Sequence, residues 1–147
     1  MDNQGKRVLI TGISGFVGSY LARELINRGY GVYGLVRKKS QKEKIKRLEI
    51  LRIYDDVKLL DGDITNLTSL LMILNKIDPE IIFHLAAQSY VPYSFQNPLE
   101  TFYPNCLGTQ NLLEAVRLSE KIDPKIVFAG SSEEYGLLFR RNIMKNF

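Results

Sequence analysis

The chain has 147 residues, of which 45% are hydrophobic and 24% charged, and its formal net charge is +4. This length and composition predict one globular domain and exclude a disordered tail, a coiled coil and a collagen-like chain. One cysteine, Cys106, and one histidine, His84, exclude an internal disulfide framework and argue against a zinc site. No apolar run reaches the ~20 residues of a membrane span and no signal peptide is visible, so we expect a cytoplasmic protein without a membrane partner.

The net positive charge comes from two stretches, residues 37–47 with a net charge of +6 and residues 137–147 with +3, and the remainder of the chain is net negative. Such stretches either bind nucleic acid or form a solvated helix face and an exposed end. We favour the second interpretation and expect no nucleic-acid partner.

Strand and helix patterns alternate along the chain. In chain order they predict a strand at 6–11, a helix at 16–28, a strand at 31–36, a helix at 40–54, a strand at 57–60, a helix from Asn66 or Thr68 to about 76, a strand at 80–86, a helix from 98 to about 121 and a strand at 124–129. Pro104 lacks an N–H, so the last helix should kink or begin there. The alternation predicts an α/β fold with a doubly wound parallel sheet, strand order 3-2-1-4-5.

A glycine-rich segment, TGISGFVG at residues 11–18, joins the first strand to the first helix. Gly12 permits a tight turn, Gly15 lets the backbone approach a diphosphate, and Gly18 allows close contact between helix and strand. The amides at the helix N-terminus then hold the anion, in the manner of a Rossmann dinucleotide site. The predicted cofactor residues here are Gly12, Ser14, Gly15, Phe16, Val17 and Gly18.

The ends of the next strands predict the rest of the cofactor site. Strand two ends in Arg37 and two lysines where an NAD site usually has an acid, so we expect NADP, with NAD as the alternative. Asp63 and Ile64 follow strand three, where Asp63 can accept a hydrogen bond from the adenine amino group. The small residues after strand four let a flat cofactor lie against Leu85, Ala86 and Ala87. We expect His84, inside that strand, to be a satisfied core residue.

The segment GSSEEYG follows strand five, at the edge of the sheet where ligands bind in such folds. Its hydroxyls and carboxylates, on Ser131, Ser132, Glu133 and Glu134, could orient and deprotonate a sugar. A loop with helix caps and surface acids is the alternative interpretation.

These motifs together resemble the extended short-chain dehydrogenases/reductases that act on nucleotide sugars. HLAAQSYVPYSF, the basic segment after strand two and GSSEEYG are most similar to the GDP-mannose 4,6-dehydratase family, and nearly as similar to GDP-4-keto-6-deoxymannose reductases. The resemblance covers residues 6–136. It implies a GDP-linked sugar as substrate and a dehydration in which NADP takes up hydride and returns it.

The resemblance also implies roles for single residues. Ser131 corresponds to the residue that hydrogen-bonds the sugar 4-hydroxyl, and Glu133 to the glutamate that removes the C5 proton. Ser132 lies where glucose-type dehydratases carry an aspartate and the GDP-mannose type carries serine. Gln88 and Ser89 would line the sugar site, and Asn105 would support the loop beside it.

One family feature is missing. The family carries a Tyr-x-x-x-Lys pair after the position of Ser131, and no tyrosine follows Tyr135 here. The only match, Tyr54 to Lys58, lies before strand three, and we interpret it as chance. We therefore expect residues 1–136 to form an NAD(P)-binding Rossmann domain incomplete at its C-terminal side, followed by a basic tail unlike the family at 137–147, with no substrate domain.

This departure leaves several functions open. The chain is a truncated dehydratase-like cofactor part, or a fragment of a reductase or nucleotide-sugar epimerase, or a non-catalytic dinucleotide-binding module. Apolar area left exposed beside strands four and five predicts a homo-oligomer or a complementing fragment as partner, with the helix from 98 to about 121 as the contact.

Overall fold

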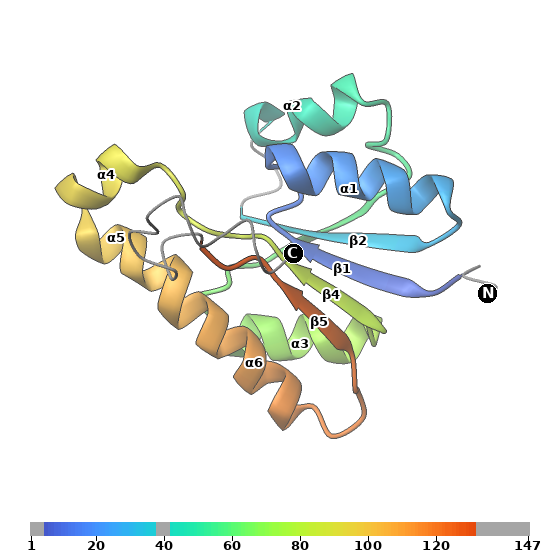
Figure 1. The fold of residues 1–147 in the computed structure, drawn as a ribbon. Coiled ribbons are helices and arrows are strands. Elements are labelled where there is room, and N and C mark those ends of the chain that lie inside the picture. The colour runs from blue at the N-terminus through green and yellow to red at the C-terminus, as the bar shows by residue number, and fades with distance from the viewer. Residues whose placement is uncertain (1–4, 38–41, 132–147) are drawn as a thin grey trace, which may run out of the picture.

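Five parallel strands form the centre of the structure, a computed structural model that describes residues 5–37 and 42–131. Their order is β3-β2-β1-β4-β5, which confirms the predicted doubly wound topology (Figure 1). The strands are β1 (Arg7–Thr11), β2 (Gly31–Val36), β3 (Lys58–Asp61), β4 (Ile81–His84) and β5 (Lys125–Phe128). Each bound lies within two residues of the sequence prediction.

Helices cover both faces of the sheet (Figure 1). On one face lie α1 (Phe16–Asn27) and α2 (Lys42–Ile50), and on the other α3 (Leu67–Ile77) and α6 (Gly108–Leu118). Because alternate residues of a strand point to opposite faces, Val8 and Ile10 of β1 enter the core under α1 and Leu9 enters the core under α3 and α6. All three are fully buried.

The helix α2 ends four residues before its predicted end. The backbone of Arg52 is left-handed, with φ 56°, and the Ile53 amide turns back to the Leu48 carbonyl at 3.0 Å. This closing turn follows a pattern usually made with glycine. Ile53 is buried as its apolar character predicts, but as part of the turn and not of the helix.

The long helix predicted from residue 98 is three consecutive segments. They are α5 (Pro98–Phe102), a π-helical turn η1 (Tyr103–Leu107) and α6. Pro104 lies in the π-helical turn, so the irregularity expected at this proline is confirmed. A further short helix, α4 (Val91–Gln96), was not predicted. Both α4 and α5 lie beyond the carboxyl ends of the strands (Figure 1).

The two candidate starts of the third helix are resolved in favour of Asn66. Its side chain Oδ1 accepts a hydrogen bond from the Ser69 amide at 2.9 Å, so Asn66 is the N-cap. At the other end, Asp78 closes the helix in a left-handed conformation, φ 45°.

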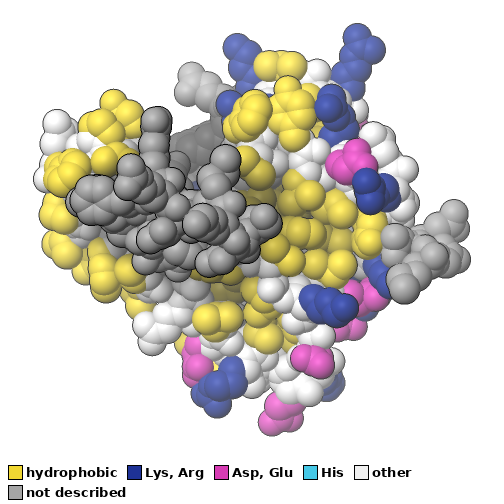
Figure 2. Space-filling view, in the orientation of Figure 1, with side chains coloured by type: hydrophobic (Ala, Val, Ile, Leu, Met, Phe, Trp, Pro, Cys, Tyr) yellow, Lys and Arg dark blue, Asp and Glu magenta, His cyan; other side chains and the backbone are white. Residues whose placement is uncertain are grey.

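Among residues 5–37 and 42–131, the helices cover the α1 side of the sheet only partly near its β5 edge. Figure 2 shows hydrophobic side chains gathered between α1 and β5. Ile81 and Phe83 of β4 are half-buried there, and Val127 of β5 is exposed.

Candidate functional site

A cavity of about 1190 Å³ opens at the carboxyl ends of β1, β2, β3 and β4. In a doubly wound sheet this is the edge at which ligands bind. The residues predicted from the sequence to hold a cofactor all line it: Gly12, Ser14, Gly15, Phe16, Val17, Gly18, Arg37, Asp63, Ile64, Leu85, Ala86 and Ala87. The fold therefore brings together, in one cavity, segments that lie far apart in the sequence.

The glycine-rich turn is shaped by contacts that exclude side chains. Gly12 has φ +75°, and a Cβ there would lie 2.8 Å from the backbone of Leu85 and Ala86. A Cβ on Gly18 would lie 2.4 Å from the Gly12 carbonyl oxygen. These distances leave no room for a side chain at either position, so the tight turn at Gly12 and the close helix contact at Gly18 both require glycine. The Gly15 amide donates to the Gly12 carbonyl at 3.0 Å and closes the turn.

The N-terminus of α1 faces the cavity. Its N-cap is Gly15, which offers no side-chain cap, and the first turn carries no acidic residue. The amides at the start of α1 therefore meet no side-chain acceptor within the helix, and the positive end of the helix dipole adds to them. Together with the cavity, this arrangement suits a diphosphate.

Two guanidinium groups flank the turn. Arg37 is exposed at the end of β2 and lines the cavity. Arg47 of α2 donates from Nη1 to the Ser14 carbonyl at 3.0 Å and lies over the Phe16 ring at 6.0 Å. Sequence reasoning missed Arg47 because it counted this residue among the charges of a solvated helix face. No sequence spacing reveals that α2 folds back onto the turn.

Asp63 and Ile64 form the wall beside β3. Asp63 Oδ1 accepts from the Thr65 amide at 2.9 Å and from the Thr65 hydroxyl at 2.8 Å. Ile64 is held from α6, because Asn111 Nδ2 donates to its carbonyl at 3.2 Å. A Cβ on Gly108 would lie 2.6 Å from Ile64 Cδ1, so any larger residue where α6 meets this wall would require the Ile64 side chain to move.

The segment after β4 is pinned by Asn105. The Gln88 amide donates to Asn105 Oδ1 at 2.7 Å, and Asn105 Nδ2 donates to the Gln88 carbonyl at 3.0 Å. Gln88 and Ser89 line the cavity, whereas Asn105 is not among its lining residues and instead supports their backbone. His84 is 2% exposed and bonded through both ring nitrogens, to Thr11 and Thr109, which confirms a satisfied core histidine.

Several lining residues were not predicted. Tyr93 of α4 and Glu100 of α5 line the cavity and are joined by a hydrogen bond from the tyrosine hydroxyl to the carboxylate. That bond is the main cause that raises the pKa of Tyr93. Tyr103, Pro104 and Leu107 line the same side. The available signal was Pro92, which favours the first turn of a helix and could have predicted α4 after the Gln88 segment.

The predicted catalytic segment is only partly visible. Ser131 is exposed, shortly after the end of β5, while Ser132 and Glu133 lie outside the described residues. The Tyr54–Lys58 match lies at the start of β3, at the opposite end of the strands from the cavity. Lys58 Nζ donates to the Tyr33 hydroxyl at 3.5 Å and lies over that ring.

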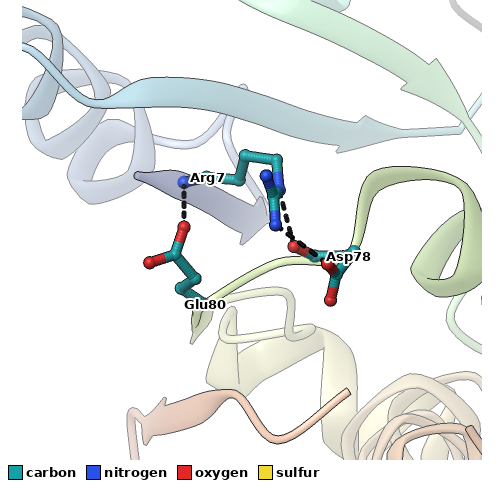
Figure 3. Close-up of polar contacts among 3 residues, drawn as sticks. All are labelled: Arg7, Asp78 and Glu80. Atoms are coloured by element: carbon teal, nitrogen blue, oxygen red, sulfur yellow. Dashed lines mark hydrogen bonds and ion pairs between the residues drawn. The ribbon is translucent and has the colours of Figure 1, made fainter. Parts of the chain in front are cut away.

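A polar cluster at the amino ends of the strands is structural (Figure 3). The backbone amide of Arg7 donates to Glu80 Oε1 at 3.2 Å. The Arg7 side chain donates from Nε to the Asp78 carbonyl at 2.7 Å, and its Nη2 pairs with Asp78 Oδ2 at 2.9 Å. These bonds tie the turn after α3 to the start of β1. Over residues 5–37 and 42–131, no group of side chains could hold a metal ion, and no helix is long and apolar enough to cross a membrane.

The sheet order, the glycine-rich turn and the cavity at the carboxyl ends define a dinucleotide-binding fold of the extended short-chain dehydrogenase/reductase class. Solved structures agree. UDP-glucose 4-epimerase from Stenotrophomonas maltophila, with bound NAD, superposes with a TM-score of 0.80 at 25% identity, covering 94% of this chain and 40% of that one. The enzyme of the same name from Brucella ovis, in complex with NAD, gives 0.77 at 28% identity, covering 93% and 39%.

Sequence comparisons narrow the class to one family. The family model described as GDP-mannose 4,6 dehydratase matches residues 9–145. GDP-mannose 4,6-dehydratase from Vibrio cholerae is 41% identical over 140 residues, which are 90% of this chain and 37% of the relative. The human GDP-mannose 4,6 dehydratase is 40% identical over 134 residues, 87% and 36% of the two chains. The chain belongs to the GDP-mannose 4,6-dehydratase family, and it spans less than two-fifths of the length of these relatives.

Proposed function

We propose that the cavity binds NADP(H) and that the chain forms the cofactor-binding part of a nucleotide-sugar dehydratase acting on a GDP-linked sugar. The observation that carries the proposal is the convergence of all twelve predicted cofactor residues on one cavity. Membership of the dehydratase family supports the sugar and the reaction.

The cavity fits the proposed cofactor in its chemistry. The amides at the start of α1 receive the diphosphate, and Gly12 and Gly15 keep side chains out of its path. Asp63 Oδ1 already accepts two hydrogen bonds from Thr65, so we assign Asp63 Oδ2 as the acceptor for the adenine amino group. Leu85, Ala86 and Ala87 offer a flat wall toward the nicotinamide end.

The preference for NADP over NAD is proposed from charge. Arg37 lines the cavity at the end of β2, the position from which a ribose 2′-phosphate is recognised. A guanidinium can pair with a phosphate through two parallel hydrogen bonds. The Arg47 guanidinium lies nearby on the glycine-rich turn and adds to the positive potential.

The sugar end is assigned to the side of the cavity formed by Gln88, Ser89 and Tyr93. Bound NADP⁺ supplies a hydride acceptor beside the sugar. From the family resemblance, Ser131 hydrogen-bonds the 4-hydroxyl and Glu133 takes the proton from C5. Ser132, in place of an aspartate, supports a GDP-mannose type of substrate.

A nucleotide-sugar epimerase is the second candidate, favoured by the names of the solved structures that share the fold. Their identities of 25% and 28% are lower than the 41% to a dehydratase. We therefore place the dehydratase first.

The diphosphate site is tested with an acid placed in the first turn of α1. Val17→Asp puts a carboxylate at an exposed lining position, and Val91→Asp makes the same change at an exposed first-turn position of α4 outside the cavity. We expect Val17→Asp to fold normally, since an acid suits a helix N-terminus, but to lose NADPH binding in a fluorescence titration. Val91→Asp should bind like the unchanged chain. Equal binding by both variants would refute the proposed diphosphate position.

A further inference from the structure

A continuous series of hydrogen bonds crosses the molecule behind the cavity wall. Thr11 Oγ1 lies 2.7 Å from His84 Nδ1, and His84 Nε2 lies 3.0 Å from Thr109 Oγ1. Thr109 Oγ1 donates to the Asn105 carbonyl at 2.7 Å. The Asn105 side chain then holds both backbone groups of Gln88. The series joins the end of β1, next to Gly12, to the segment assigned to the sugar.

The partners determine where each proton lies. Thr11 Oγ1 accepts from the Ala86 amide at 3.2 Å and from the Leu85 amide at 3.2 Å, the latter shared with the Thr11 carbonyl at 3.2 Å. A hydroxyl has two acceptor sites and one proton, so the Thr11 proton is donated to His84 Nδ1. Nδ1 is therefore an acceptor, and the ring carries its proton on Nε2. That proton goes to Thr109 Oγ1, whose own proton goes to the Asn105 carbonyl.

The surroundings of the ring agree with this assignment. His84 is 2% exposed, and it is stacked with Phe128 of β5, the ring centroids lying 5.7 Å apart. Burial lowers the pKa of His84 from its ordinary value. A second proton on Nδ1 would face the Thr11 hydroxyl, whose acceptor sites are already used. The ring is thus neutral in a fixed orientation.

We propose that His84 is a positioning residue that, as the neutral Nε2–H tautomer, fixes the glycine-rich turn and the Gln88 segment at a constant spacing. Through Thr11, the ring fixes the position of the Leu85 and Ala86 amides. Through Thr109, it fixes the position of Asn105 and so of Gln88. The ring does not line the cavity and acts through these residues. The consequence for ligand binding rests on the function proposed above, whereas the tautomer and the coupling do not.

The tautomer is measured first. His84 is the only histidine of the chain, so two-bond ¹H–¹⁵N correlation spectra of the untagged, ¹⁵N-labelled protein at pH 7 contain one imidazole. We expect an unprotonated Nδ1 and a protonated Nε2. The opposite tautomer, an exchanging mixture of the two or an imidazolium ring would overturn the proposal. This measurement uses the unchanged chain and does not depend on a variant that folds.

The coupling is measured with variants of Thr109. Thr109→Val removes the acceptor of Nε2–H and the donor to Asn105, while Thr109→Ser keeps the hydroxyl. Thr101→Val is the matched control, because Thr101 makes the same kind of bond to the carbonyl four residues earlier, that of Asn97 at 3.2 Å, outside the series.

We expect Thr109→Val to shift the amide signals of both Leu85 and Gln88, to disturb the tautomer signature and to weaken NADPH binding about tenfold, since a buried polar partner is lost. Thr109→Ser should restore all three, and Thr101→Val should change none. A folded Thr109→Val protein with unchanged Leu85 and Gln88 signals would contradict the coupling. If the unchanged chain binds no NADPH, the proposed function fails, but the amide and tautomer signals still decide this inference.

Discussion

At the scale of single residues, we expect the charge at the end of β2 to set the preference of the cavity between NADP(H) and NAD(H). Arg37 is exposed and lines the cavity, so its guanidinium is free to meet a ligand phosphate that only NADP(H) carries. The proposed interaction would join a cation to a dianion near the surface, so we expect salt to weaken it.

Replacing Arg37 by Asp reverses this charge. We expect the affinity for NADP⁺ to fall at least about tenfold and the affinity for NAD⁺ to change much less, because a charge-assisted hydrogen bond contributes roughly 1.5–3 kcal/mol. Arg23→Asp is the matched control, since Arg23 is an exposed arginine of α1 that packs over Tyr20 and does not line the cavity. Calorimetric titration of both variants checks the prediction, which is wrong if the unchanged chain binds NADP⁺ and NAD⁺ equally.

The single histidine, His84, predicts how the free energy of unfolding changes with pH. Burial makes the pKa of His84 in the folded chain lower than the ordinary 6.5 that applies when the chain is unfolded. Between those two values the unfolded chain binds a proton that the folded chain does not. The free energy of unfolding should therefore fall as pH drops below about 6.5, and should be independent of this group above it.

Urea unfolding of the chain between pH 5 and pH 8 measures this dependence. The ¹H signals of His84 over the same range show whether the change in stability follows the protonation of this ring. Exposed carboxylates titrate near pH 4, so they contribute little to the upper part of this window. Stability that rises as pH falls from 6.5 to 5, or a histidine that becomes protonated at its ordinary pKa in the folded chain, would contradict the account.

At the scale of elements, the start of α1 depends on backbone contacts that only glycine permits. Gly12 combines a left-handed backbone, φ +75°, with close backbone neighbours, whereas Gly5 has φ +82° and nothing within 4 Å of an added Cβ. The two positions separate the effect of conformation from the effect of crowding.

We expect Gly12→Ala to lower the free energy of unfolding by about 3 kcal/mol and Gly5→Ala by about 1 kcal/mol. Alanine is strained in a left-handed backbone at both sites, but only at Gly12 must Leu85 and Ala86 also move. Urea unfolding compares the two variants. Equal losses of unfolding free energy in the two variants would show that Leu85 and Ala86 move at little cost. The backbone contact would then not explain why position 12 is glycine.

Regular elements were predictable because local pattern and tertiary packing agree. The apolar run of β1 and the glycine spacing before α1 fix both elements without knowledge of their neighbours. The helices beyond the strands were less predictable. Val91–Gln96 has no buried residue, so it lacks the apolar periodicity that reveals a helix. The π-helical turn at Pro104 is joined to a distant segment by the bonds between Asn105 and Gln88, which no local pattern reveals.

The same reasoning explains which site residues were found. Gly12, Arg37 and Asp63 follow strands, so the topology alone places them at one edge of the sheet. Arg47 reaches the glycine-rich turn and Tyr93 reaches the cavity through the packing of whole helices, for which no local pattern exists. Sequence reasoning thus located the side of the cavity formed by the strand ends better than the side formed by α4 and α5.

At the scale of the whole molecule, apolar side chains are exposed on the helices beyond the strands. Phe95 of α4 is 83% exposed and Leu99 of α5 is 65% exposed. Exposed apolar side chains gathered on neighbouring helices are typical of interaction sites. We expect a second copy of the chain to associate through this surface at high micromolar concentration.

Sedimentation velocity over a range of concentrations measures the association. The double variant Phe95→Ser and Leu99→Ser should remain monomeric, while Met72→Ser, which removes an equally exposed side chain from α3, should associate like the unchanged chain. A strictly monomeric unchanged chain at high micromolar concentration would contradict the prediction.

Residues 132–147 contain no Tyr-x-x-x-Lys pair, and this predicts the activity of the 147-residue polypeptide assayed on its own. Ser131 and Glu133 are present, but no tyrosine follows Tyr135. Since loss of a general base slows a reaction by about 10²–10⁴-fold, we expect the purified 147-residue chain to dehydrate GDP-mannose at least that much more slowly than the Vibrio cholerae relative assayed beside it. Mass spectrometry follows the loss of water. Comparable rates would mean that another group, with Glu134 or Tyr135 examined first, serves as the base.

The central claim is that the cavity is an NADP(H) site, and a crystal structure of the chain grown with NADP⁺ tests it most directly. We predict the diphosphate against the amides of Phe16 and Val17 at the start of α1, the 2′-phosphate on Arg37 and the nicotinamide toward Gln88. A dinucleotide bound elsewhere, a reversed orientation, or a cavity left empty at saturating NADP⁺ would contradict the claim.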